Sequence, residues 1–126
     1  MVGKNIIDRA PNNFEIIKSE SKLIDLTNFD SIDNFLNVEK PDLIIHCAGL
    51  VGGIQSNISN PVKYLIKNLE IGKNIVLAAK KNNIKNMINL SSSCIYPRNI
   101  NYPLTENLIL TGELEPTNEG YALAKI

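Results

Sequence analysis

The order of apolar segments between residues 42 and 93 is the feature that most constrains the fold. Residues 42–48 contain an apolar core without alternation, Leu43-Ile44-Ile45, which is typical of a strand buried on both faces of a parallel sheet. Asn60 and Pro61 then provide a capping side chain and a first-turn proline, so a helix is predicted from there to about residue 82. Residues 87–90 form the next predicted strand. Strands that alternate with helices predict an α/β fold with a doubly wound parallel sheet.

The rest of the chain predicts shorter elements. A helix is expected over residues 6–10, a strand over residues 14–17, and a second helix over residues 28–38, where apolar residues recur at helical spacing. Residues 95–117 contain three prolines and little periodicity, and we expect this irregular stretch to be functional. No repeat or linker divides the chain, so residues 1–126 are predicted to form a single domain. The apolar side chains that the long helix is expected to bury are Val62, Leu65, Ile66, Leu69, Val76 and Ala79.

Composition excludes several classes of function. The chain has 126 residues, with 13 basic and 13 acidic side chains, and this balance favours neither nucleic acid nor an anionic membrane as a partner. Two cysteines and one histidine cannot form a usual tetrahedral zinc site, so no metal is expected. No apolar run approaches the about 18 residues of a membrane helix, and no signal peptide is recognisable. A cytoplasmic location is therefore expected.

Tyr121 and Lys125 form a Tyr-x-x-x-Lys pair. Residues four apart share one face of a helix, so the phenol and the ammonium are expected to lie close together. A nearby cation stabilises a phenolate and lowers the pKa of the phenol from about 10, which would let Tyr121 exchange a proton with a carbonyl or an alcohol. Taken alone, this pattern is far more often an ordinary exposed pair.

Ser92 changes that interpretation. It lies in a run of three serines that ends a predicted strand, where α/β sheets place their ligands, and Tyr121 follows 29 residues later. A hydroxyl there can hydrogen-bond a carbonyl that receives a hydride. This arrangement resembles the Ser-Tyr-Lys triad of short-chain dehydrogenases, although a serine cluster at a strand end is often simple turn chemistry.

Three longer strings carry a more specific resemblance. They are Val51-Gly52-Gly53-Ile54 with Asn57, the segment SSCIYP at residues 92–97, and LEPTNEGYALAKI at residues 114–126. On these strings the chain resembles the GDP-L-fucose synthases of the extended short-chain dehydrogenase/reductase family, over essentially its whole length. In many relatives a proline stands where this chain has Gly120, a change that frees the backbone and is not expected to remove the chemistry.

The resemblance implies an activity and four catalytic residues. The family epimerises carbons 3 and 5 of GDP-4-keto-6-deoxy-D-mannose and then reduces the 4-keto group with NADPH. Tyr121 matches the general acid at O4, Lys125 the residue that holds the nicotinamide ribose and tunes Tyr121, and Ser92 the serine that binds the same carbonyl. Cys94 matches a cysteine implicated in proton transfer during epimerisation. Cys47 and His46, in contrast, are interpreted as packed side chains.

NADP(H) is the cofactor that the resemblance implies. Residues 1–3 correspond to the end of the family's glycine-rich turn, from which only Gly3 remains. Lys18 or Lys22 would replace an arginine that relatives use near Ser21 for the 2′-phosphate, although an ammonium matches a phosphate less well than a guanidinium does. The residues expected to contact the cofactor are Gly3, Asp25, Leu26, Ala48, Gly49, Leu90, Ser91, Ser92, Ser93 and Lys125.

The resemblance also implies that the chain is a fragment. It predicts a partial Rossmann-like, NADP-binding domain that lacks its first strand, its later strands, a sugar-nucleotide subdomain and a histidine that pairs with the cysteine. The chain alone is expected to be marginally folded and inactive, and the full-length form is expected to be a homodimer. Two alternatives remain: another NDP-sugar epimerase, dehydratase or reductase of the extended family, or a non-catalytic remnant that only associates with a full-length partner.

Overall fold

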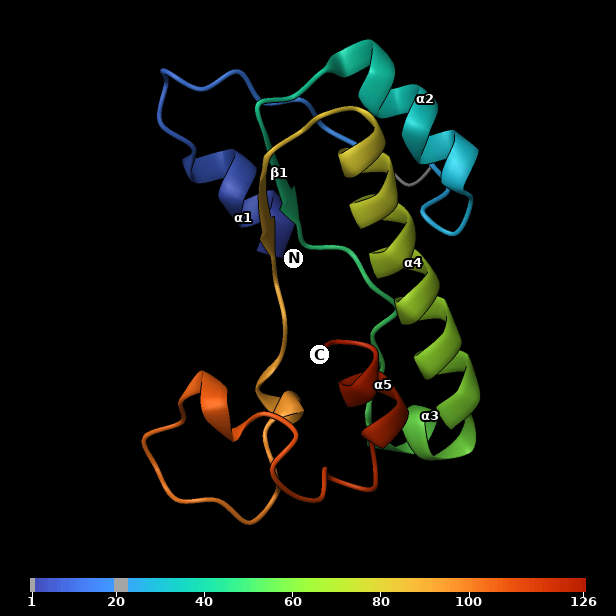
Figure 1. The fold of residues 1–126 in the computed structure, drawn as a ribbon, viewed down its shortest axis with the longest axis vertical. Coiled ribbons are helices and arrows are strands. Elements are labelled where there is room, and N and C mark those ends of the chain that lie inside the picture. The colour runs from blue at the N-terminus through green and yellow to red at the C-terminus, as the bar shows by residue number, and fades with distance from the viewer. Residues whose placement is uncertain (1, 20–22) are drawn as a thin grey trace. The chain divides into compact units, whose positions relative to one another are not determined.

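The computed structural model of the chain describes residues 2–19 and 23–126. Its helices and strands alternate through the middle of the chain (Figure 1). Among the described residues, no helix is both long enough and apolar enough to cross a membrane. The elements in chain order are α1 (Val2–Arg9), α2 (Phe29–Glu39), β1 (Leu43–His46), α3 (Ile54–Ser59), α4 (Pro61–Lys81), β2 (Asn86–Asn89), two 3-10 turns η1 (Ser93–Ile95) and η2 (Glu106–Leu108), and α5 (Glu119–Leu123).

Strands β1 and β2 pair in parallel, with Leu43 opposite Asn86 and His46 opposite Asn89. The backbone N–H of Leu90 donates to the carbonyl of His46 at 3.1 Å and extends the pairing by one step. Parallel strands require a long crossover connection, and α3 and α4 provide it. The predicted α/β fold with a parallel sheet is therefore confirmed.

The described chain divides into two compact units. Residues up to 48 and residues 73–90 form the first, and residues 49–72 and 91–126 form the second. The core of the first unit combines α2, the last part of α4 and the turn before α2. Its buried members are Ile24, Ile32, Leu36, Ile75 and Ala78.

Helix α2 confirms the helix predicted over residues 28–38. The side chain of Asn28 caps it by accepting a hydrogen bond from the Ser31 N–H at 3.2 Å. Lys40 ends it in a left-handed conformation with φ 44°, and its N–H donates to the carbonyl of Leu36 at 3.0 Å. Pro41 follows and prevents the helix from continuing.

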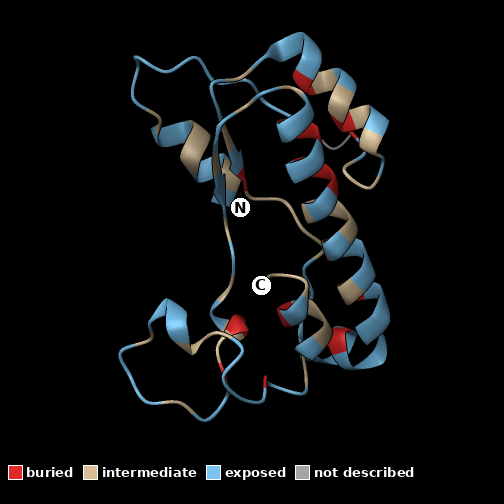
Figure 2. Ribbon diagram, viewed as in Figure 1, coloured by how far each residue is buried: buried red, intermediate tan, exposed pale blue. Residues whose placement is uncertain are grey.

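The buried face of α4 differs from the predicted one. Of the six side chains expected to be buried, only Ala79 is buried; Leu65 is half-buried, and the other four are exposed. Figure 2 marks the positions that α4 does bury in red. The periodicity was right but the face was wrong, because α4 turns polar side chains inward to hydrogen-bond loop backbone. The residues that α4 buries are Tyr64, Asn68, Asn74, Ile75, Ala78 and Ala79.

Two strand predictions also need correction. Residues 14–17 form no strand, because a strand needs a hydrogen-bonded neighbour, and the sheet of the described residues contains only β1 and β2. Strand β1 is not buried on both faces. Ile44 and His46 face the core side, whereas Leu43 and Ile45 alternate to the other face and are exposed.

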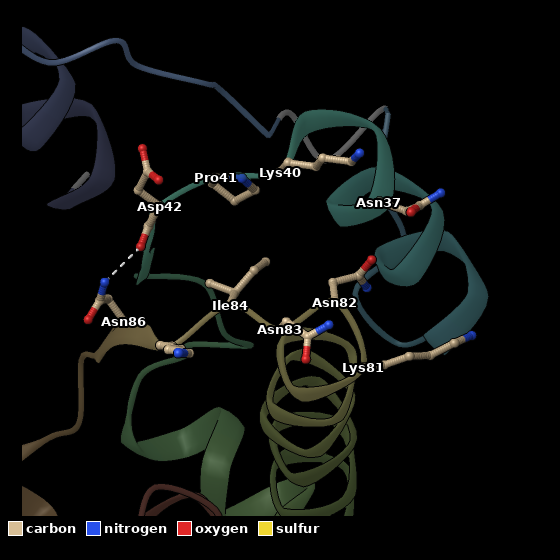
Figure 3. Close-up of a pocket in the computed structure, with 10 residues that line it drawn as sticks. Asn37, Lys40, Pro41, Asp42, Lys81, Asn82, Asn83, Ile84 and Asn86 are labelled. Carbon is tan, nitrogen blue, oxygen red and sulfur yellow. Dashed lines mark hydrogen bonds between the residues drawn. The ribbon is translucent and has the colours of Figure 1, made fainter.

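A polar pocket lies in the first unit where α2 and α4 end (Figure 3). Its lining includes Lys40, Lys81 and Lys85, and the Asn86 side chain donates to the carbonyl of Asp42 at 3.1 Å across its edge. Helix C-termini carry partial negative charge and attract cations, which accounts for the lysines. None of the predicted site residues is among the described residues that line it.

Candidate active site

The serine run after β2 leads into η1, which carries Cys94. Ser92 has an extended backbone, with φ −149° and ψ 149°, and immediately precedes η1. This local change from extended chain to a tight turn brings two side chains of the same segment together. The Cys94 thiol donates to the Ser92 hydroxyl oxygen at 3.1 Å, and the pair is partly buried.

Tyr121 and Lys125 lie on one face, as predicted, although only Tyr121 is within α5. The chain continues to turn after the helix, because the N–H of Lys125 donates to the carbonyl of Ala122 at 2.9 Å. This extra turn places the ammonium nitrogen of Lys125 5.9 Å from the centroid of the Tyr121 ring. Both side chains are half-buried.

The two segments converge. Helix α5 packs against η1, and Ser92 and Tyr121 share a side-chain hydrogen bond. The Ser91 hydroxyl donates to the backbone carbonyl of Lys125 at 2.8 Å and fixes the end of the chain to the serine run. The four residues predicted to be catalytic, Ser92, Cys94, Tyr121 and Lys125, are therefore brought together in the second unit.

The electrostatics of Tyr121 differ from the sequence prediction. Burial raises the pKa of Tyr121 above its ordinary value, Cys94 raises it further, and the hydrogen bond from Ser92 lowers it. Lys125 was expected to lower this pKa, but burial prevails, and burial also lowers the pKa of Lys125 itself. A phenol with a raised pKa keeps its proton at neutral pH. This state suits a proton donor rather than a base.

Gly49 lies directly beside Lys125. A Cβ atom at position 49 would be 2.9 Å from the Asn68 side-chain oxygen and 3.3 Å from the Lys125 ammonium nitrogen. A side chain at this position would crowd both groups, so glycine is required for the close approach. Of the predicted cofactor residues, Gly49, Ser91, Ser92, Ser93 and Lys125 belong to the second unit.

Asn68 is a site residue that the sequence analysis missed. Its side-chain oxygen accepts from the Leu50 N–H at 2.8 Å, and its amide donates to the carbonyl of Leu50 at 3.0 Å and to that of Tyr64 at 2.8 Å. It is only 3% exposed. These bonds hold the loop next to Gly49 in place. The signal in the sequence was an asparagine in the middle of the predicted long helix, which is a poor position for one without a hydrogen-bonding role.

The glycine-rich loop after Leu50 is held in a similar way. The Asn57 side chain donates to the carbonyls of Gly52 at 3.0 Å and Gly53 at 3.1 Å. The Ser56 hydroxyl and the Tyr64 phenol are 2.8 Å apart and hydrogen-bond. Residues 50–53 therefore form a loop whose backbone is held by Asn57 of α3 and Asn68 of α4.

The other predicted cofactor residues belong to the first unit. Gly3 lies in the first turn of α1, and Asp25 and Leu26 form the turn that precedes α2. Ala48 and Leu90 follow the two strands. Lys18 is exposed, and the alternative phosphate contact at Lys22 lies outside the described residues, as do Met1, Glu20 and Ser21.

Comparison with known proteins identifies the family. The profile of the NAD dependent epimerase/dehydratase family matches residues 2–126. The chain belongs to this family. The match covers both segments that converge at Ser92 and Tyr121, together with the turns that carry the predicted cofactor residues.

Curated relatives align with this chain over essentially its whole length. A GDP-L-colitose synthase from Yersinia pseudotuberculosis is 54% identical over 127 residues, which cover 100% of this chain and 41% of that protein. A GDP-L-fucose synthase from Azorhizobium caulinodans is 44% identical and covers 99% of this chain and 40% of its own length. The chain thus spans about 40% of the length of these relatives.

Solved structures confirm the fold class. A GDP-L-fucose synthetase from Naegleria fowleri bound to NADP superposes with a TM-score of 0.83 at 28% identity and covers 97% of this chain and 39% of that chain. The Rossmann-like α/β architecture predicted from the alternating strands and helices is therefore shared with members of the family.

Proposed function

We propose that this chain is part of an NADP-dependent enzyme that epimerises a GDP-linked 4-keto-deoxyhexose and reduces its 4-keto group. The observation that supports this most is the convergence of Ser92, Tyr121 and Lys125 in the second unit. The curated relatives act on GDP-linked sugars by name, and the Naegleria structure holds NADP.

The residues present fit the cofactor. Gly49 lies beside the ammonium of Lys125 with no side chain between them, and these groups would hold the nicotinamide ribose. Asp25 and Leu26 would contact the adenine. When bound, NADPH supplies the hydride that reduces the carbonyl carbon.

The chain's own side chains would handle the carbonyl oxygen. Ser92 and Tyr121 share a hydrogen bond, so a carbonyl oxygen that enters between them can accept from both hydroxyl groups. Tyr121 donates its proton as negative charge develops on that oxygen, and Lys125 stabilises the resulting phenolate. The raised pKa of Tyr121 keeps the proton available until that step.

Cys94 would serve the epimerisation. The carbons next to a ketone are acidic, and a thiol can exchange a proton with such a carbon on the face that it approaches. A second acid–base group on the opposite face would complete the change of configuration, and this is the role of the histidine that the family pairs with the cysteine. The hydrogen bond to Ser92 places this thiol next to the groups assigned to the carbonyl. One site can therefore act both on the carbonyl oxygen and on its neighbouring carbons.

A second product is supported by the comparison itself. Identity to the GDP-L-colitose synthase is 54%, against 44% for the GDP-L-fucose synthase. L-Colitose is the 3-deoxy counterpart of L-fucose, so the two products differ at one hydroxyl. The described residues that bind the carbonyl suit either sugar.

A chimaera tests the proposal. The isolated chain is expected to be inactive, because it spans only 41% of its relative. We would therefore replace the matching segment of the Yersinia GDP-L-colitose synthase by this chain, which gives a full-length chimaera. NADPH oxidation with each GDP-linked keto-sugar, followed by identification of the product sugar, should give GDP-L-colitose or GDP-L-fucose. A folded chimaera without NADPH-dependent turnover would instead support the non-catalytic remnant.

Assembly and location complete the proposal. We propose a homodimer at full length, since α4 exposes an apolar row that includes Val62, Ile66 and Leu69. Analytical ultracentrifugation of the chimaera should give a dimer. We also propose a cytoplasmic location, because NADPH is the reductant of cytoplasmic biosynthesis, and fractionation of source cells would test it.

A further inference from the structure

The turn before α2 is tightly organised around Asp25. Its carboxylate oxygen accepts from the N–H of Thr27 at 2.9 Å and from the Thr27 hydroxyl at 2.7 Å. Its own N–H donates to the Ser31 hydroxyl at 3.1 Å, and its carbonyl accepts from the N–H of Asn28. Asp25 nevertheless remains exposed. The turn thus presents a carboxylate to solvent on a fixed backbone.

Asn74 holds the same turn from α4. Its side-chain amide donates to the carbonyl of Thr27 at 3.0 Å and reaches that of Leu26 at 3.4 Å. Asn74 is only 4% exposed and is separated from the turn by 47 positions in sequence. Asparagine is a weak helix former, and a buried amide is unfavourable without partners, so its place on α4 depends on these two carbonyls.

Leu26 adds a second constraint. Its side chain packs against the buried core of the first unit, whereas the neighbouring Asp25 is exposed. Asn74 hydrogen-bonds the carbonyls of the two residues that follow Asp25 in the chain. These bonds fix which of the side chains of Asp25 and Leu26 faces the core. A turn without them could rotate and move the carboxylate.

We propose that Asn74 is a positioning residue for cofactor recognition: it holds the Leu26–Thr27 carbonyls so that the Asp25 carboxylate can accept a hydrogen bond from the amino group of adenine. This inference rests on the proposed function, which assigns Asp25 to the adenine. In this proposal Asn74 acts through the turn and makes no contact of its own with the cofactor. Its effect is pre-organisation of the contact rather than an added contact.

A purely structural role makes a different prediction. If Asn74 only stabilised the fold, its loss would weaken the binding of every nicotinamide cofactor equally. If it positions Asp25, its loss should matter only for a cofactor that carries the adenine amino group. The reduced hypoxanthine analogue of NADPH has a carbonyl oxygen in place of that amino group and keeps the nicotinamide, the riboses and the phosphates.

The experiment compares the two cofactors in the chimaera. For Asn74→Ala we expect KM for NADPH to rise about five- to tenfold, with kcat retained and with little change in KM for the hypoxanthine analogue. Asn74→Asp keeps the shape but cannot donate, and should behave in the same way. Asn82→Ala is the matched control, because this asparagine of the same unit donates instead to Asp33 and to the carbonyl of Ala78.

A double-mutant cycle with Asp25→Ala gives a second readout. Once the carboxylate is gone, removing Asn74 should have little further effect on NADPH binding. Equal losses for the two cofactors, or additive losses in the cycle, would overturn the inference and leave the proposed function intact. Should Asn74→Ala fail to fold, the cycle is measured with Asn74→Asp. An inactive parent chimaera would count against the proposed function instead.

Discussion

The Cys94 thiol donates a hydrogen bond to the Ser92 hydroxyl oxygen over 3.1 Å, and Ser92 in turn hydrogen-bonds Tyr121. One serine therefore joins the thiol assigned to epimerisation to the phenol assigned to reduction. The two neighbours act on Tyr121 with opposite signs: Cys94 raises the pKa of the phenol, and the hydrogen bond from Ser92 lowers it.

Removing these two neighbours should move the titration of Tyr121 in opposite directions. The electrostatic repulsion from Cys94 disfavours the phenolate and raises the pKa of Tyr121. Cys94→Ala removes this repulsion and should lower the pKa of Tyr121. Ser92→Ala removes a hydrogen bond that favours the phenolate and should raise it. Absorbance titration of the chimaera, minus that of Tyr121→Phe, isolates this phenol. Shifts in the same direction would contradict the arrangement.

Loss of Asn68 should loosen the loop beside Gly49. Asn68→Ala removes three hydrogen bonds and leaves the Leu50 N–H and carbonyl without these partners, so we expect the chimaera to lose about 1–3 kcal/mol of stability. Asn86→Ala removes one exposed bond to the carbonyl of Asp42 and should change stability by less than about 0.5 kcal/mol. Urea denaturation compares the two. Equal effects would mean that Asn68 is no more than a surface contact.

Gly120 should tolerate no side chain without a shift of α5. A Cβ at this position would lie 2.5 Å from the carbonyl oxygen of Pro61, so Gly120→Ala should destabilise the chimaera by about 1–3 kcal/mol and slow turnover, because Tyr121 is the next residue. Gly72 lies inside α4 with no atom within 4 Å of such a Cβ. Gly72→Ala should therefore stabilise the helix by about 0.5–1 kcal/mol. Thermal unfolding measures both changes, and an unaffected Gly120→Ala would show that α5 can move freely.

The ion pair of Asp33 should make the stability of the folded chain depend on pH in the acid range. Its carboxylate lies 2.6 Å from the ammonium of Lys81, and this partner lowers the pKa of Asp33 below its ordinary 3.8 in the folded chain. A lowered folded pKa contributes stability that is complete above the unfolded value and is lost as pH falls through the folded value. Asp33→Asn should thus be less stable than the parent at neutral pH, with a difference that disappears in strong acid. A difference that did not change with pH would rule out the ion pair as its source.

Much of the fold could be predicted from local signals. The cap at Asn28, the proline at position 61 and the apolar run Leu43-Ile44-Ile45 each specify an element without help from distant residues, and each element is present. The strand at residues 14–17 was predicted wrongly because strand formation depends on a neighbour that the segment itself cannot encode. The buried face of α4 was missed for a related reason, since asparagines on a helix reveal their role only when the loops they hold are in place.

The convergence of the site residues could be predicted from the sequence, whereas their electrostatics could not. The spacing from Ser92 to Tyr121 and Lys125 was sufficient to expect convergence, and the structure confirms that these residues meet. The sign of the Tyr121 pKa shift could not be predicted, because it depends on burial, which the sequence pattern does not reveal. The catalytic and cofactor roles of these residues remain predictions.

Replacement of Tyr121 by phenylalanine tests the catalytic assignment most directly. In the chimaera, Tyr121→Phe removes the proposed proton donor but keeps the ring beside the Lys125 ammonium. We predict that kcat for NADPH oxidation by the GDP-linked keto-sugar falls about 10²- to 10⁴-fold, whereas NADPH still binds with the affinity of the parent. Full turnover by Tyr121→Phe would contradict the assignment of Tyr121 as the acid that completes the reduction.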